Sequence, residues 1–183
     1  MHHLRPALFA LCAALVLPAL LGMDGLRALS TAEAQADRPA WLAMPLANAR
    51  TGETFTLADF QGRAVYVEPM ATWCTNCRQQ LQTVRDVRGQ VGDQFVFVGL
   101  SVETDISSEA LARYADEQGF DWTFAVMTPE MLRELSATYG RTIANPPATP
   151  HFVIRPDGSA GSLSTGQHSA EALVQELAAA SGG

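Results

Sequence analysis

Short apolar runs alternate along the chain with stretches whose apolar residues recur every three or four positions. The runs predict strands at 64–68, 95–102, 122–127 and 151–155. The amphipathic stretches predict helices at about 74–88 and 108–118, from Pro129 to Tyr139 and after Ser169, with Gly89 expected to end the first. Residues 161–165 are expected to pair with 151–155 as a hairpin. Strands that alternate with helices before a closing hairpin and helix indicate an α/β sandwich with a mixed sheet.

The first 36 residues have the pattern of a targeting segment. Arg5 precedes an almost uncharged apolar run from Pro6 to Gly22, and Ala34-Gln35-Ala36 has small residues at the two positions that a signal peptidase recognises. We therefore expect a signal peptide over 1–36 and one domain over 37–183, exported to the periplasm or another extracytoplasmic space. An uncleaved membrane anchor is the alternative, because an apolar run of about 17–18 residues can just span a bilayer.

Charge excludes some classes of partner. The chain of 183 residues has a formal net charge of −7, contains no lysine, and shows no basic patch along its sequence. Nucleic acid and anionic lipid are therefore not expected as partners. A membrane contact is expected only if the N-terminal segment is uncleaved.

The most informative motif is Cys74-Thr75-Asn76-Cys77, which follows a predicted strand and opens a predicted helix. Unpaired backbone N–H groups and the helix dipole favour a thiolate there, and the thiolate is the nucleophile of disulfide exchange. A disulfide across so short a loop adds little stability, so we expect redox chemistry in which Cys74 attacks and Cys77 resolves. A zinc site is not expected, since only His151 and His168 remain downstream as further soft ligands and no second Cys-x-x-Cys is present.

Four segments together resemble the thioredoxin superfamily and, within it, the exported TlpA/ResA-like thiol–disulfide oxidoreductases. They are Val65–Glu68 leading to Ala71–Arg78, the stretch Thr56–Arg63, Thr149-Pro150 with the strand and Asp157-Gly158 after it, and the extra elements between Phe95 and Tyr139. The resemblance implies a thioredoxin-like three-layer sandwich with a mixed central sheet flanked by helices, a central insertion, and no cofactor. Asn76 departs from the pattern, because many relatives have proline there.

The resemblance also implies substrate-binding residues near the cysteines. A cis bond between Thr149 and Pro150 would face the thiols and expose backbone for strand-like pairing with a substrate. The proline-rich loop alone favours an ordinary trans bond. Trp73 is expected in an apolar docking surface beside the thiols, with core packing as the alternative.

Glu68 holds the position that resembles the buried acid beneath the dithiol of thioredoxin. Burial would raise the pKa of this carboxyl and let it exchange a proton with Cys77, which makes Glu68 the third expected catalytic residue. The alternative is a glutamate turned to solvent at a strand end, with Pro69 breaking the strand.

The expected function is a protein-disulfide oxidoreductase, and more specifically a reductase of exported proteins. The resemblance implies roles in cytochrome c or copper-centre maturation, protein disulfides as substrates, and a membrane thiol relay as electron donor. One alternative is an SCO-type copper-assembly protein that binds Cu(I) through the cysteines, Met70 and His151, although the SCO motif has three residues between its cysteines. The other is a disulfide-forming oxidase or a peroxide-reducing enzyme. Strand alternation turns His151 away from the thiols, and His168 is expected in a solvated loop.

Overall fold

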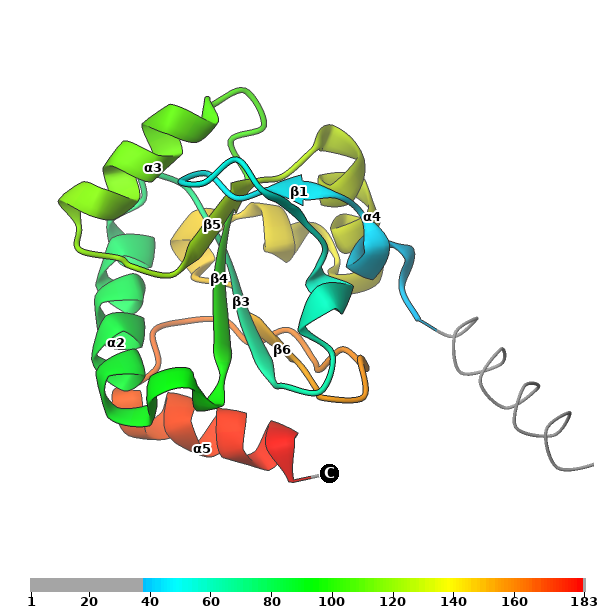
Figure 1. Cartoon of the computed structure of the whole chain (residues 1–183), viewed down its shortest axis with the longest axis vertical. Helices are drawn as coiled ribbons and strands as arrows, with labels where there is room; N and C mark the ends of the chain where they lie inside the picture. The colour runs from blue at the N-terminus through cyan, green and yellow to red at the C-terminus, as the bar shows by residue number, and fades with distance from the viewer. Residues whose placement is uncertain (1–37, 183) are drawn as a thin grey trace, which may run out of the picture. The chain divides into compact units, whose positions relative to one another are not determined.

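The computed structural model describes residues 38–182 (Figure 1). The predicted signal peptide, 1–36, lies outside these residues. The strands are β1 Leu46–Ala47, β2 Thr54–Phe55, β3 Val65–Met70, β4 Val96–Ser101, β5 Thr123–Val126 and β6 Phe152–Ile154. The α-helices are α2 Thr75–Val91, α3 Ser108–Glu117, α4 Pro129–Tyr139 and α5 Ala170–Ser181. Short 3-10 turns are η1 Ala40–Ala43, η2 Leu57–Phe60, η3 Gly92–Gln94, η4 Arg141–Ala144 and η5 Pro146–Ala148.

The central sheet has the strand order β5-β4-β3-β6. β3, β4 and β5 run parallel, and β6 pairs antiparallel with β3. Every residue of β3 and of β4 is buried, as expected for apolar strands in the middle of a sheet covered on both faces. The predicted mixed sheet is confirmed.

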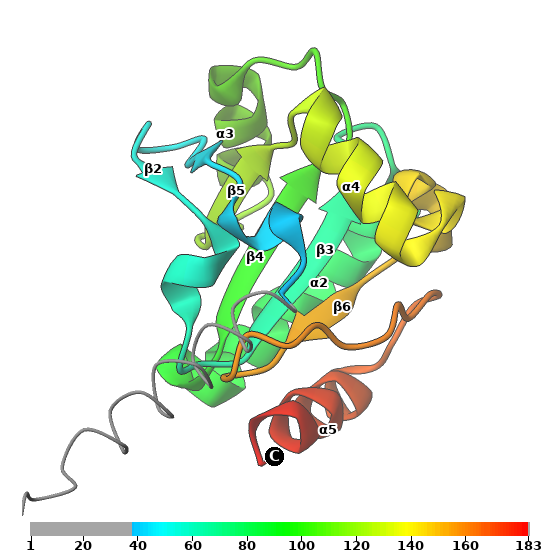
Figure 2. The same cartoon turned by 90° about the vertical axis from the view of Figure 1, so that its right-hand side faces the viewer.

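Side chains that alternate above and below the strands build two apolar layers. α2, α3 and α5 cover one face, where they bury Leu81, Leu111 and Leu173. η1 and α4 cover the other face, where they bury Trp41 and Leu135. Figures 1 and 2 show α2 and α3 on one side of the sheet and α4 on the other. Each large side chain that is fully buried stabilises the fold by about 1.5–3 kcal/mol. Because both faces of the sheet carry such side chains, helices are needed on both faces, which gives the three-layer sandwich.

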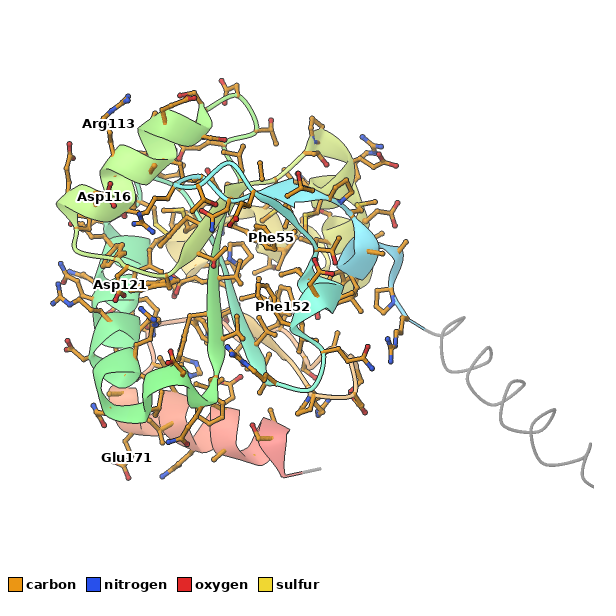
Figure 3. The ribbon with its side chains drawn as sticks, in the orientation of Figure 1. Phe55, Arg113, Asp116, Asp121, Phe152 and Glu171 are labelled. Atoms are coloured by element: carbon orange, nitrogen blue, oxygen red, sulfur yellow. A yellow bond between two sulfur atoms is a disulfide. The ribbon has the colours of Figure 1, made fainter. Side chains whose placement is uncertain are left out.

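The stick view separates core from surface in the same way (Figure 3). Phe152 lies inside, against Trp41 and Tyr139, with ring centroids 5.4 Å and 4.7 Å away. Arg113 and Glu171 point outward from α3 and α5. Charged side chains therefore lie at the surface, around a core built on both faces of the sheet.

Three helices begin where the sequence places a hydroxyl side chain. Ser107, Thr128 and Ser169 each accept a hydrogen bond from the backbone N–H three residues on, at the starts of α3, α4 and α5. Pro129 follows Thr128 at the first helical position, as predicted. Within residues 38–182 no helix combines the length and apolar character needed to cross a membrane.

Two local predictions and one alternative, the strand break at Pro69, are wrong in detail. α2 runs through Gly89 to Val91, and it ends at Gly92, whose φ of 57° suits glycine. Pro69 does not break β3: β6 pairs only with Val65–Val67, so Pro69 lies where the strand has a neighbour on one side. The hairpin after β6 is reduced to two isolated bridges, His151 with Ser164 and Ile154 with Ala160.

Candidate active site

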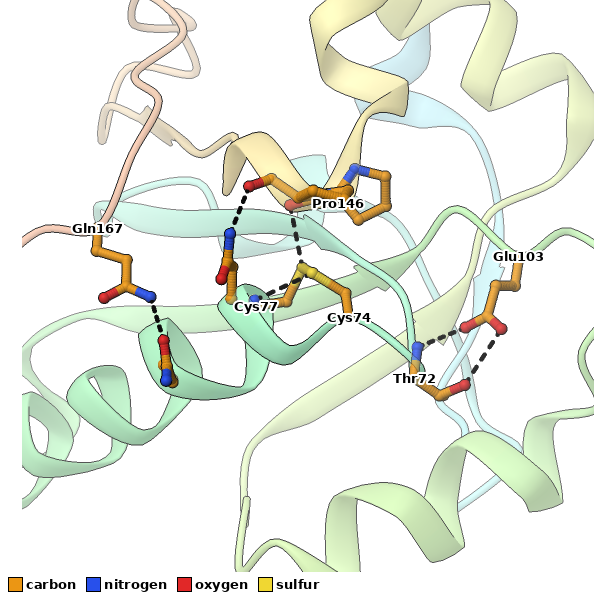
Figure 4. Close-up of a disulfide and its surroundings, with 9 residues drawn as sticks. Thr72, Cys74, Cys77, Glu103, Pro146 and Gln167 are labelled. Carbon is orange, nitrogen blue, oxygen red and sulfur yellow. Dashed lines mark hydrogen bonds between the residues drawn. A yellow bond between two sulfur atoms is a disulfide. The ribbon is translucent and has the colours of Figure 1, made fainter.

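The cysteine pair sits at the junction between β3 and α2 (Figure 4). Cys74 is the N-cap of α2, and its Sγ accepts a hydrogen bond of 3.1 Å from the backbone N–H of Cys77. The two cysteines form a disulfide, with their Cα atoms 5.3 Å apart. After reduction, the same N–H and the helix dipole would stabilise a Cys74 thiolate.

The two sulfur-bearing residues differ in their access to solvent. Cys74 retains 3% of its surface and Cys77 none, while the neighbouring Trp73 is 63% exposed. A nucleophile has to be reached by its substrate, so Cys74 is the better placed attacker. The exposure of Trp73 excludes core packing for this side chain, and its place in a docking surface stays a prediction.

The side chain of Glu103 holds the turn that leads into Cys74. The carboxylate of Glu103 accepts the backbone N–H of Thr72 at 2.6 Å and its hydroxyl at 3.1 Å (Figure 4). The N–H of Cys74 in turn bonds the carbonyl of Ala71 at 3.0 Å. Glu103 lies 31 residues away in sequence, and no local motif indicated this contact.

The proline-rich loop faces the start of α2 through its backbone. The Sγ of Cys77 lies 3.2 Å from the carbonyl oxygen of Pro146, which a Cys77 thiol could donate to. The side-chain amide of Asn76 donates to the carbonyl of Pro147 at 3.0 Å. Asn76, which stands where many relatives have proline, therefore anchors this loop beside the disulfide.

The predicted cis bond before Pro150 is wrong. No peptide bond between residues 38 and 182 is cis, so Thr149 and Pro150 are joined by a trans bond. Thr149 makes the turn instead, with φ 44° and ψ 57°, and its N–H bonds the carbonyl of Pro146 at 2.7 Å. A trans bond is the more stable state of most X–Pro pairs, and the left-handed residue supplies the change of direction. Both residues are buried.

Glu68 is fully buried in β3, so the solvent-facing alternative is wrong. Its side chain points to the same face of β3 as those of Tyr66 and Met70, because side chains two residues apart in a strand share a face. Tyr66 and Met70 belong to the apolar layer that contains Cys77, so Glu68 faces α2. Tyr66 donates its hydroxyl to Oε2 of Glu68 at 3.0 Å, while Oε1 has no hydrogen-bond partner. Burial raises the pKa of Glu68 to about 8, against a smaller lowering by the Tyr66 hydrogen bond.

His151 contacts Glu176 and Tyr66. Its Nε2 is 3.2 Å from Oε2 of Glu176, and its ring stacks on Tyr66. His168 lies in a loop as expected, but it is only partly solvated, because its ring packs edge-on against His151 and its side chain is 27% exposed. Met70 is fully buried, as expected for a packing residue.

The sequence model of the AhpC/TSA family matches residues 41–159, which is well over half of the chain and includes both cysteines and Glu68. The chain belongs to the AhpC/TSA family. Over 78 residues this family member is 30% identical to the thioredoxin-like protein YneN of Bacillus subtilis (strain 168). That match covers 42% of this chain and 45% of YneN, so it spans less than half the length of that relative.

Solved structures show that the fold is thioredoxin-like. A thiol:disulfide interchange protein of the thioredoxin family from Chlorobium tepidum is 24% identical, with a TM-score of 0.61 over 75% of this chain and 92% of that one. A secreted disulfide oxidoreductase of Mycobacterium tuberculosis, homologous to Escherichia coli DsbE, is 16% identical, with a TM-score of 0.60 over 75% and 96% of the two chains. The predicted fold is confirmed by these likenesses and by the mixed sheet.

Proposed function

We propose that this AhpC/TSA family member is an exported thiol–disulfide oxidoreductase that reduces disulfides in other exported proteins. The observation that carries the proposal is the position of Cys74: its sulfur caps α2, accepts the Cys77 N–H and is disulfide-bonded to Cys77. Two structural neighbours named as a thiol:disulfide interchange protein and a secreted disulfide oxidoreductase support this assignment.

The reaction begins from the reduced dithiol. The Cys74 thiolate attacks one sulfur of a substrate disulfide, that S–S bond breaks, and the other substrate sulfur leaves as a thiolate. The Cys77 thiol then loses its proton and attacks Cys74 Sγ. The mixed disulfide breaks, the Cys74–Cys77 disulfide forms, and the second substrate thiolate is released. Two electrons pass from the enzyme to the substrate, and a membrane thiol relay is the proposed donor that returns them.

Glu68 is the proposed proton acceptor for Cys77. A carboxyl with a pKa of about 8 is mostly protonated at neutral pH and becomes a base as the pH approaches that value. The unpartnered Oε1 of Glu68 leaves one oxygen available for a proton. The rate at which Cys77 resolves the mixed disulfide should therefore rise with pH to a plateau above about 8, and this rise should be lost in Glu68→Gln.

Substrate contact is assigned to the exposed surface around the disulfide. Trp73 offers a large apolar face next to Cys74. Thr149 and Pro150 are buried, so we assign them the role of shaping the loop that brings the Pro146 and Pro147 carbonyls to the start of α2. The copper-assembly alternative needs His151 beside the cysteines, whereas the contacts of this imidazole are with Glu176 and Tyr66.

The reduction potential of the Cys74–Cys77 pair separates the reductase from an oxidase. Equilibration of the full chain with glutathione or dithiothreitol, followed by alkylation of free thiols, measures it. A value near the −270 mV of thioredoxin is expected for a reductase, whereas a value near −120 mV would assign the site to disulfide formation. A pair that neither reagent reduces while the fold is intact would refute both assignments.

A further inference from the structure

Three side chains that the redox mechanism does not use meet on the α5 side of the sheet. His151 immediately precedes β6, His168 lies in the segment before α5, and Glu176 is on α5. Nε2 of His151 is 3.2 Å and Nδ1 of His168 is 3.9 Å from the same carboxylate oxygen of Glu176. One ligand atom from each residue lies within 4.8 Å of the others.

The two histidines are held by contacts that do not involve Glu176. The backbone N–H and carbonyl of His151 pair with Ser164 at 3.0 Å and 2.8 Å, and its buried ring stacks on Tyr66 with centroids 5.2 Å apart. Gln80 of α2 accepts the backbone N–H of His168 at 2.7 Å and donates to its carbonyl at 3.4 Å. The ring of His151 and the backbone of His168 are therefore held before any ligand arrives, which lowers the cost of binding one.

The cluster is closed on one side and open on the other. His151 has no exposed side-chain surface, whereas the side chains of His168 and Glu176 are 27% and 28% exposed. Glu176 offers a carboxylate oxygen that faces Nε2 of His151 at 3.2 Å and Nδ1 of His168 at 3.9 Å. A cation can thus approach from solvent and keep a water molecule on the open side.

We propose that His151 Nε2, His168 Nδ1 and Glu176 Oε2 form a binding site for a divalent metal ion of the Zn²⁺ class. Ligands about 2.0–2.2 Å from a tetrahedral Zn²⁺ lie about 3.3 Å from each other, and the two distances to Glu176, 3.2 Å and 3.9 Å, are already close to that spacing. Two imidazoles favour Zn²⁺ over Mg²⁺ or Ca²⁺, which prefer all-oxygen sites.

An ion pair without metal explains only part of this arrangement. A His151–Glu176 pair would need one imidazole, yet a second imidazole presents Nδ1 to the same oxygen. This site was not predictable from the sequence, because its ligands are 17 and 8 residues apart and match no metal-binding spacing. A bound ion would join the start of β6, the segment before α5 and α5 itself, and would stabilise the folded chain in proportion to its occupancy.

The test uses the untagged full chain with Cys12 replaced by serine and the Cys74–Cys77 disulfide oxidised, so that no cysteine can act as a thiolate ligand. Zn²⁺ is titrated against a chromophoric chelator, and Mg²⁺ serves as the ion that should not compete. One Zn²⁺ per chain is expected, with affinity at least about tenfold weaker in His168→Ala and in Glu176→Gln. Replacing His2 and His3 by glutamine should leave the site unchanged, which makes that variant the matched control.

Thermal unfolding provides the second measurement. Zn²⁺ should raise the melting temperature of the parent chain and of the His2/His3 variant but not that of His168→Ala, whose side chain is partly exposed and whose loss the fold should tolerate. Absence of one-to-one binding, or equal binding and equal thermal shifts in the parent chain and His168→Ala, would overturn the proposal. Neither measurement depends on redox activity, so the metal site can fail while the dithiol assignment stands.

Discussion

Replacing Glu68 by glutamine should change how the stability of the protein depends on pH. The substitution keeps the shape of the side chain and an oxygen that can accept the Tyr66 hydroxyl. It removes the charge that the folded protein must bury when the carboxyl ionises. Glu68→Gln therefore isolates the free-energy cost of an ionised carboxylate at a fully buried position.

The magnitude follows from the shift of the Glu68 pKa. Folding raises that pKa from 4.5 to about 8, which costs the ionised folded state about 4 to 5 kcal/mol. Below pH 4.5 the carboxyl is protonated in both folded and unfolded chains, and the penalty is absent. Between 4.5 and 8 the folded chain retains a proton that the unfolded chain has lost, so stability falls as the pH rises, and above 8 the full penalty remains.

Urea unfolding of the oxidised proteins between about pH 5 and pH 9 measures this effect. The unfolding free energy of the parent chain, relative to Glu68→Gln, should fall by about 4 kcal/mol across that range. Other titrating groups are common to both proteins and cancel in the difference. Glu117→Gln, which removes an exposed carboxylate, is the matched control for the loss of one charge. A free-energy difference that stays constant across this range would refute the buried-acid assignment.

Three further substitutions test the surroundings of the dithiol. Tyr66→Phe removes the hydrogen bond that lowers the Glu68 pKa, so a carboxyl titration followed by ¹³C NMR should give a value above about 8; an unchanged pKa would contradict the contact. Trp73→Ala should alter the unfolding free energy by no more than about 0.5 kcal/mol yet raise the KM for insulin reduction several-fold, whereas an unchanged KM would remove Trp73 from the docking surface. Glu103→Ala leaves two donors of Thr72 without their acceptor and should lower the unfolding free energy by about 1.5–3 kcal/mol in urea; no measurable loss would show that the turn is held by other contacts.

The fold was predictable because its signals are local. Periodicity located the strands of the sheet and the helices that cover it. The hydroxyl residues Thr128 and Ser169 precede two of these helices, and the structure confirms both helix starts. Gly89 misled, since glycine can continue a helix when packing favours it, and the following Gly92 supplies the positive φ. The family resemblance also misled at Pro150, because the backbone turns at Thr149 instead.

The candidate site was only partly predictable, because several of its contacts join distant segments. Cys74 and Cys77 follow from one motif, and the burial of Glu68 was expected from the family resemblance, because alternation along β3 alone left a solvent-facing side chain open. The Glu103 carboxylate reaches Thr72 only after β4 has paired with β3. The meeting of His168 with His151 likewise depends on how α5 packs, which no spacing along the chain encodes.

Trapping of the mixed disulfide tests the central claim most directly. The reduced full chain is mixed with a disulfide-bonded protein substrate, quenched with an alkylating reagent and analysed by mass spectrometry. In a chain whose Cys12 is replaced by serine, Cys77→Ser should accumulate a covalent adduct joined through Cys74, and Cys74→Ser should give no adduct, because the remaining Cys77 is fully buried and lacks the helix N-cap position. An adduct joined through Cys77, or substrate reduction by Cys74→Ser at the rate of the parent chain, would contradict the account.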